Sequence, residues 1–188
     1  MVSFLLVYAT GEGQTTRVAT RLASTLEARG HETTTVELGK ATPSVDVDAH
    51  DAVLVGASIH LGKHQKAVRR FLESHREALA GKPTAFFQLS LSSATEEGAE
   101  QAVEYADELF ETTDWHPDRI GLFGGALRFS EYGLLTRFMM KRIVKETLPE
   151  VDPSVDTEFT DWEEVDAFAE DVAAFVEGRL GMAPPSVE

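Results

Sequence analysis

The sequence predicts a doubly wound α/β fold, with a five-stranded parallel sheet and helices on both faces. Five short runs of apolar or β-branched residues alternate with segments of helical periodicity. Most connections between them are short, as is usual in βαβ units. Three polar loops follow the first, third and fourth of these runs, so we expect them at the carboxyl end of the sheet, where such folds bind ligands.

The chain begins with a βαβ pattern. Residues 2–8 are an apolar run of the length of a buried parallel strand. Residues 14–29 carry an apolar residue every fourth position, which predicts a helix with one buried face. Residues 31–38 are rich in threonine and valine and predict the second strand.

The same alternation continues to the end of the chain. In order we expect a strand at 51–56, a glycine-bearing loop at 57–64, one helix ending before Gly81, a strand at 84–89, a polar loop at 90–95, a helix at 98–111, a strand at 119–125 and a last helix at 161–179 capped by Thr160 or Asp161. These elements predict a single domain over residues 1–180, followed by a loose tail at 181–188.

Composition excludes several classes of function. The 188 residues are 43% hydrophobic and contain no cysteine, which excludes disulfides and thiol chemistry. The formal net charge of −15 argues against nucleic acid as a partner, because phosphate backbones need a positive surface. Such an acidic surface is also typical of proteins from a high-salt cytoplasm. We see no signal peptide and no membrane-spanning run, so we expect a cytoplasmic protein.

The loop formed by Thr10, Gly11, Glu12, Gly13, Gln14, Thr15 and Thr16 joins the first strand to the first helix. Helix N-termini bind phosphate through unpaired main-chain N–H groups, and threonine hydroxyls add donors. The loop contains no lysine or arginine and matches neither the triphosphate-binding nor the dinucleotide-binding glycine pattern. We therefore predict a site for one phosphomonoester. The alternative is that the glycines only make a tight turn, with Thr15 as a helix cap.

A long insertion separates the fifth strand from the last helix. Residues 134–148 show helical spacing of apolar residues, at Leu134, Leu135, Phe138, Met139, Ile143, Val144 and Leu148. Residues 126–148 carry five bases against two acids, a net charge of +3 that leaves −18 for the rest of the chain. The bases are Arg128, Arg137, Lys141, Arg142 and Lys145. A basic amphipathic helix predicts a surface for anionic lipid or an acidic partner. The alternative is a helix that covers the sheet's edge, with its bases paired to the protein's own acids.

Several motifs together resemble the flavodoxin-like, menaquinone-dependent protoporphyrinogen IX dehydrogenases. They are the phosphate loop, Gly56–His60, Trp115–Arg119, Gly124–Phe129, Arg137–Met139 and Thr160–Glu163. The resemblance covers nearly the whole chain. The segment from Gly125 to Arg128 with the basic helix is more specific to this family than the phosphate loop, which marks flavodoxins generally.

The resemblance implies a bound FMN, oxidation of protoporphyrinogen IX to protoporphyrin IX, and transfer of the electrons to a quinone such as menaquinone. It places the FMN phosphate at Thr10 to Thr15. It places the flavin ring between two loops, formed by Ser58, Ile59, His60, Leu61 and Gly62 and by Ser90, Leu91, Ser92 and Ser93. Arg128 is a candidate partner for a porphyrin propionate or for a local carboxylate, and the basic helix is a candidate for peripheral contact with the inner face of the cell membrane.

No catalytic acid–base residue and no metal site follow from the sequence. His60 and His64 flank the predicted ring and are candidates for proton transfer, although surface histidines are common. Ordinary flavodoxins place aromatic side chains against the flavin, whereas Ile59, His60 and Leu91 stand at those positions here. Two other functions remain open: an electron-carrying flavodoxin or a quinone reductase with another substrate, and an interaction module without flavin.

Overall fold

The computed structural model describes residues 1–39, 44–130, 133–152 and 155–182. Five strands form a parallel sheet in the order β2-β1-β3-β5-β6, with β1 at Ser3–Tyr8, β2 at Glu32–Glu37, β3 at Ala52–His60, β5 at Thr84–Ser90 and β6 at Arg119–Gly124. The strand order reverses direction beside β1, so the fold is the predicted doubly wound α/β fold. Most of the expected tail lies outside the described residues.

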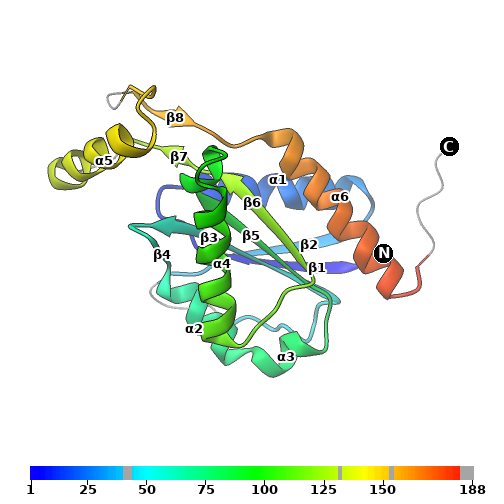
Figure 1. Cartoon of the computed structure of the whole chain (residues 1–188). Helices are drawn as coiled ribbons and strands as arrows, with labels where there is room; N and C mark the ends of the chain where they lie inside the picture. The colour runs from blue at the N-terminus through cyan, green and yellow to red at the C-terminus, as the bar shows by residue number, and fades with distance from the viewer. Residues whose placement is uncertain (40–43, 131–132, 153–154, 183–188) are drawn as a thin grey trace.

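Helices cover both faces of this sheet (Figure 1). On one face lie α1 (Gln14–Ala28) and α6 (Trp162–Arg179), and on the other lie α2 (Lys66–Ser74), α3 (Arg76–Ala80) and α4 (Ala99–Thr113). In β1, Phe4 and Leu6 belong to the core under α1 and α6, whereas Leu5 and Val7 belong to the core under the other helices. This alternation is the period of two that a strand buried on both faces requires.

The third strand is longer than predicted. The sequence indicated a loop after Gly56, but β3 continues to His60 and folds back into β4 (Lys63–His64), with Ile59 opposite His64. Leu61 and Gly62 form the turn, both with positive φ (50° and 75°). The prediction was wrong because β3 extends beyond its last pair with β5, at Ser58, and its end pairs with β4 in a hairpin, where polar residues are tolerated.

The predicted helix before Gly81 is two helices. α2 ends at Ser74 and α3 begins at Arg76, with His75 between them at φ −117°. The apolar spacing continues across this break through Phe71 and Leu79, which are both buried in the same core. Periodicity alone therefore did not reveal the interruption.

The insertion between β6 and α6 is a small unit of its own. β7 (Ala126–Leu127) pairs antiparallel with β8 (Thr157–Glu158), and α5 (Leu134–Thr147) lies between them in the chain. Met140, Val144 and Leu148 of this segment pack on Leu127 and Phe129. Figure 1 shows α5 standing out from the main body at the carboxyl ends of the sheet strands. The helix was predicted, and the two short strands were not.

Candidate functional site

A pocket lies at the carboxyl ends of β1, β3 and β5. The loops that follow these strands line it together with one side of α4 and the insertion. Its lining residues are Thr10, Gly11, Glu12, Gln14, Thr15, Ser58, Ile59, His60, Leu61, Gly62, Leu89, Ser90, Leu91, Ser92, Gln101, Tyr105, Gly125, Ala126, Met140 and Ile143. The three polar loops therefore converge as the strand order requires.

The first loop carries unused hydrogen-bond donors. Gly13 caps α1 with φ 82°, and the first helical main-chain bond runs from Arg17 N–H to Gly13 C=O at 3.2 Å. The N–H groups of the preceding turn are therefore without helical partners, as at any helix start. The Thr15 hydroxyl is buried, with the residue 1% exposed, and it has no hydrogen-bond partner among the described residues. A buried hydroxyl without a partner costs free energy, so this position indicates a ligand.

Thr10 shapes the same loop from the other side. Its Oγ1 accepts a hydrogen bond from Gly13 N–H at 2.9 Å, which leaves its hydroxyl hydrogen able to donate elsewhere. Thr15 is not a helix cap, because α1 begins one residue earlier, at Gln14, and its cap has no side-chain hydrogen bond. The loop offers neutral donors and no cation of its own, which is the donor set that suits one phosphate group.

The second wall of the pocket is the β3–β4 hairpin. Gln65 fixes its base, because Ser58 N–H donates to Gln65 Oε1 at 3.1 Å. At its tip, Leu61 is 53% exposed and has φ 50°, a conformation that costs a branched side chain about 1–2 kcal/mol. An apolar, exposed and strained residue at the mouth of a pocket is typical of a ligand contact.

The third wall is a short 3₁₀ turn after β5, at Ser92–Ala94. Ser90 Oγ accepts a hydrogen bond from Ser93 N–H at 3.0 Å, and Ser92 Oγ donates to Gln101 Oε1 of α4 at 2.8 Å. These bonds hold the turn against α4 and leave the half-buried Leu91 on the pocket's surface.

The two candidate histidines differ in position. His60 is exposed and lines the pocket. His64 is not among the lining residues, and its Nε2 lies 2.8 Å from Gln88 Oε1. Because Gln88 Nε2 donates to Ala102 C=O at 2.8 Å, Gln88 Oε1 is the acceptor and His64 Nε2 carries the hydrogen. Burial lowers the pKa of His64, against the opposing effects of Gln88 and Glu108, so His64 fixes the hairpin as a neutral side chain.

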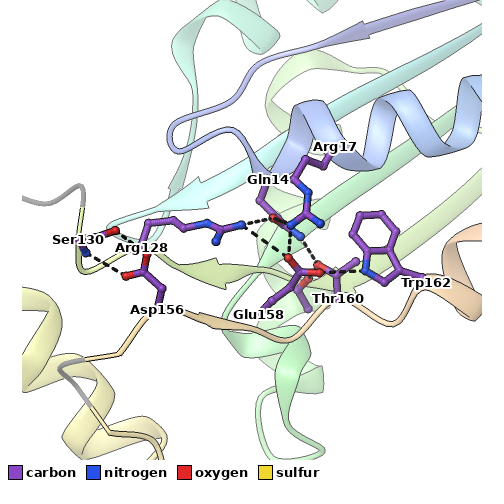
Figure 2. A network of polar contacts seen from close by, with 9 residues as sticks. Gln14, Arg17, Arg128, Ser130, Asp156, Glu158, Thr160 and Trp162 are labelled. Carbon is purple, nitrogen blue, oxygen red and sulfur yellow. Dashed lines mark hydrogen bonds and ion pairs between the residues drawn. The ribbon is translucent and has the colours of Figure 1, made fainter.

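A polar network ties the insertion to the phosphate loop (Figure 2). Gln14 Oε1 accepts from Arg17 Nη1 and from Arg128 Nη2, both at 3.1 Å, and Gln14 Nε2 donates to Thr160 Oγ1 at 2.9 Å. Both arginines also pair with Glu158, Arg128 at 3.6 Å. Burial raises the pKa of Glu158, but hydrogen bonds from Trp162 and Arg17 and the charge of Arg17 outweigh it and lower the pKa overall.

The five predicted basic residues are not one surface. Arg128 belongs to the network beside the phosphate loop, and Arg137 is half-buried, its Nε donating to Phe129 C=O at 3.0 Å. Lys141, Arg142 and Lys145 lie on the exposed side of α5. Phe138, three and four residues before Lys141 and Arg142, lies on the same side and is 71% exposed.

Thirteen of the fifteen residues predicted to bind the cofactor line the pocket, and the other two, Gly13 and Ser93, support its loops. The sequence did not indicate Gln101, Tyr105, Met140 or Ile143. Tyr105 belongs to the helix predicted at 98–111, and Met140 and Ile143 belong to a helix whose position relative to the sheet no pattern gives. Among the described residues no cluster of side chains is suited to a metal ion, and no helix is long and apolar enough to cross a bilayer.

Comparison with known proteins identifies the family of this chain. Residues 5–154 match the family model described as a flavodoxin domain. The chain belongs to the flavodoxin family. It is 32% identical over 170 residues to a protoporphyrinogen IX dehydrogenase [quinone] of Escherichia coli K12, covering 90% of this chain and 93% of that protein. It is also 29% identical over 171 residues to the protein of the same name from Leishmania major, covering 90% of this chain and 74% of that protein.

Solved flavodoxins share the fold of this family member. A flavodoxin from Bacillus cereus superposes with a TM-score of 0.56 at 15% identity, covering 93% of this chain and 97% of that one. A short-chain flavodoxin associated with a bacterial microcompartment gives the same TM-score at 16% identity, covering 94% and 99%. The predicted fold and the predicted family are thus both confirmed.

Proposed function

We propose that this flavodoxin-family protein binds FMN and dehydrogenates protoporphyrinogen IX to protoporphyrin IX, with a quinone as electron acceptor. The observation that supports FMN most directly is the buried Thr15 hydroxyl without a partner, at the first turn of α1 and on the wall of the pocket. The substrate and the acceptor rest on the names of the two relatives, which are similar over most of this chain.

The chain's own residues supply binding and orientation. Thr10, Thr15 and the first main-chain N–H groups of α1 hold the phosphate, and the hairpin at Ile59 to Gly62 and the turn at Ser90 to Ser93 hold the ring from two sides. The flavin supplies the redox chemistry when bound, taking hydrogen from the porphyrinogen and passing electrons to the quinone. Met140 and Ile143 of α5 line the remaining side, so the insertion faces the substrate and limits access of water.

Anaerobic mixing of the purified protein, loaded with FMN, with protoporphyrinogen IX and a menaquinone analogue tests the proposal. We expect porphyrin fluorescence to rise only when protein and quinone are both present. Fluorescence that stays at the level of the mixture without protein would contradict the enzyme.

An electron-carrying flavodoxin or a quinone reductase with another substrate is the second candidate. It is favoured by the pocket itself: among the described residues that line it, the titratable side chains are the exposed His60 and the half-buried Glu12 and Tyr105, and none of them is fully buried. The same anaerobic mixture separates them. If an added reductase enzyme reduces the bound flavin and no porphyrin forms, the protein is an electron carrier. If the protein reduces the quinone with a reductant other than porphyrinogen, it is a quinone reductase.

We also propose that the outer side of α5 contacts an anionic membrane peripherally on its cytoplasmic face. Lys141, Arg142 and Lys145 surround the exposed Phe138 there, on a segment of charge opposite to the rest of the chain. Cations attract anionic headgroups and an exposed aromatic side chain inserts at their level. A quinone acceptor is itself dissolved in the membrane, so docking through α5 brings the pocket close to it.

A further inference from the structure

The network around Gln14 joins two parts of the chain that lie far apart in sequence. Gln14 is the first residue of α1, and Arg128 follows β7, 114 residues later, at the start of the insertion. Figure 2 shows Arg128 reaching from the insertion to the amide of Gln14 and the carboxylate of Glu158. Glu158 lies on β8, opposite Ala126 of β7, so both strands of the insertion take part.

The side chain of Gln14 is held at every polar atom. Its Oε1 accepts from two guanidinium groups and its Nε2 donates to Thr160 Oγ1, whose hydroxyl in turn donates to Gly124 C=O at 2.7 Å. Gln14 is 5% exposed and lines the pocket. The first turn of α1 is therefore fixed in orientation by residues that belong to β6, to the insertion and to the segment just before α6.

The network also places two guanidinium groups beside a loop that has no cation of its own. Arg17 and Arg128 both pair with the carboxylate of Glu158, and the carboxylate of Asp156 lies within electrostatic range of Arg128. Hydrogen bonds from a guanidinium to Gln14 Oε1 polarise the side-chain amide and hold it in place at the first residue of α1.

We infer that Arg128 is a positioning residue for the phosphate group: through Gln14 it holds the first turn of α1 ready to bind an anion and links occupancy of that turn to the insertion. This inference rests on the proposed binding of FMN. It assigns the insertion a role in cofactor affinity, in addition to any contact with substrate. Linkage is reciprocal, so a ligand bound at the turn strengthens the contact between Arg128 and Gln14 by the same factor by which that contact raises the affinity for the ligand.

Comparison of FMN with riboflavin, which lacks the phosphate, tests the inference. In Arg128→Gln we expect the Kd of FMN to rise about tenfold and the Kd of riboflavin to change by less than about twofold, both measured by quenching of flavin fluorescence. Arg128→Lys keeps the charge without the fork of donors and should show a smaller loss for FMN, again without loss for riboflavin. Arg142→Gln is the matched control, because that arginine lies on the same insertion in an exposed pair with Glu146.

Two further measurements separate positioning from a general structural effect. In the double variant Gln14→Leu with Arg128→Gln, the loss for FMN should be no greater than in Gln14→Leu alone, because Arg128 acts through Gln14. Hydrogen exchange of the α5 main chain should slow when FMN binds the wild type, and this slowing should be lost in Arg128→Gln while persisting in Arg142→Gln.

The outcomes are distinct. Equal losses for FMN and riboflavin in Arg128→Gln, or additive losses in the double variant, overturn the positioning role. Unchanged binding of both ligands overturns it as well. If Arg128→Gln does not fold, the ratio of the two affinities in Arg128→Lys decides. A wild-type chain that binds neither flavin overturns the proposed function and this inference with it.

Discussion

Thr15 is the residue whose surroundings say most about the site. Its hydroxyl is buried at the first turn of α1 and has no hydrogen-bond partner within the described part of the chain. A residue that only caps or packs the helix would be partnered or apolar, since an unsatisfied hydroxyl costs about 1–3 kcal/mol. The position is thus better suited to binding than to stability.

Replacing Thr15 by the isosteric valine separates a role in ligand binding from a role in stability. We expect Thr15→Val to leave the free energy of unfolding of the flavin-free protein unchanged or higher, because a buried polar group without a partner is removed. The affinity for FMN should fall about tenfold, by one charge-assisted hydrogen bond. Urea unfolding and flavin fluorescence measure the two quantities.

Thr16→Val is the control, because Thr16 is half-exposed and does not line the pocket. A Thr15→Val protein that is destabilised and binds FMN as tightly as the wild type would show that the hydroxyl serves the fold.

At the scale of elements, α5 has two sides with different tasks. Met140, Val144 and Leu148 bury one side on the β7 segment, and Met140 and Ile143 reach the pocket. The opposite side carries Phe138 with the three exposed bases. The predicted apolar face was therefore partly wrong, because Phe138 and Met139, which share the helical spacing, are exposed at 71% and 39%. The side chains of residues 134–136 lie outside the part of the chain that the structure describes.

Reversing the charge of this side tests membrane docking. The triple variant with Lys141, Arg142 and Lys145 changed to Glu should lose flotation with vesicles that contain anionic lipid, because each base near such a surface contributes about 1 kcal/mol. Phe138→Ala should weaken flotation without abolishing it. Neutral vesicles should not bind the wild type.

The control is an equal change of charge on α2, where Lys66, Arg69 and Arg70 are also exposed. If changing those three residues to Glu reduces flotation as much as the α5 variant does, the overall charge is responsible and docking through α5 is wrong.

An ion cluster around the buried Glu177 joins α6 to Arg29 and His31, which lie between α1 and β2. Arg29 donates two hydrogen bonds to Glu177, from Nε and Nη2, both at 2.8 Å, and His31 Nε2 lies 2.9 Å from Glu177 Oε1. His31 Nδ1 accepts from Val2 N–H, so the hydrogen on the ring is at Nε2, directed to Glu177. The hydrogen bonds from Arg29 outweigh burial and lower the pKa of Glu177 below its ordinary value of 4.5.

A carboxylate whose pKa is lowered in the folded state stabilises the fold at pH values above its ordinary pKa. This contribution is lost as the pH falls through the lowered pKa. We expect Glu177→Gln to lower the free energy of unfolding by about 3 kcal/mol at pH 7, because Arg29 loses a buried partner. The difference from wild type should shrink as the pH falls below 4.5. Urea unfolding across this range measures it. A constant difference in unfolding free energy between the two proteins at all pH values would contradict the assignment. Glu170→Gln is the control, because Glu170 pairs with the same arginine but is exposed.

At the scale of the whole molecule, the net charge of −15 acts against compactness. Raising NaCl from about 0.1 to 1 M shortens the Debye length from roughly 10 to 3 Å, so repulsion between surface acids weakens. We expect the melting temperature to rise over this range, measured by circular dichroism, and to rise less with sucrose of equal osmolality. A melting temperature that falls with salt would show that ion pairs dominate over repulsion. The high-salt habitat remains a prediction, on which the relatives from Escherichia coli and Leishmania major do not bear.

The sheet, its helices and the loops that converge at its carboxyl edge were predictable because each depends on a local period and on a general rule of parallel sheets. Residues 10–15, 58–62 and 90–93 could be predicted to lie in loops that converge there for that reason. The hairpin at Leu61 and the break at His75 could not be predicted. At each of these positions the sequence pattern does not mark the point at which the backbone conformation changes. Tyr105, Met140 and Ile143 were missed because no short pattern states which neighbouring element a helix faces.

The sequence by itself determined the alternating strands and helices, the glycine- and threonine-rich loop without a cation, and the charge contrast of the insertion, since all of these are properties of neighbouring residues along the chain. Only the tertiary structure decided that Arg128 meets Gln14 and that α5 turns Phe138 outward while Met140 lines the pocket. The physical reason is that side-chain contacts between distant segments depend on how the packed sheet brings those segments together, and periodicity fixes a face without fixing its partner.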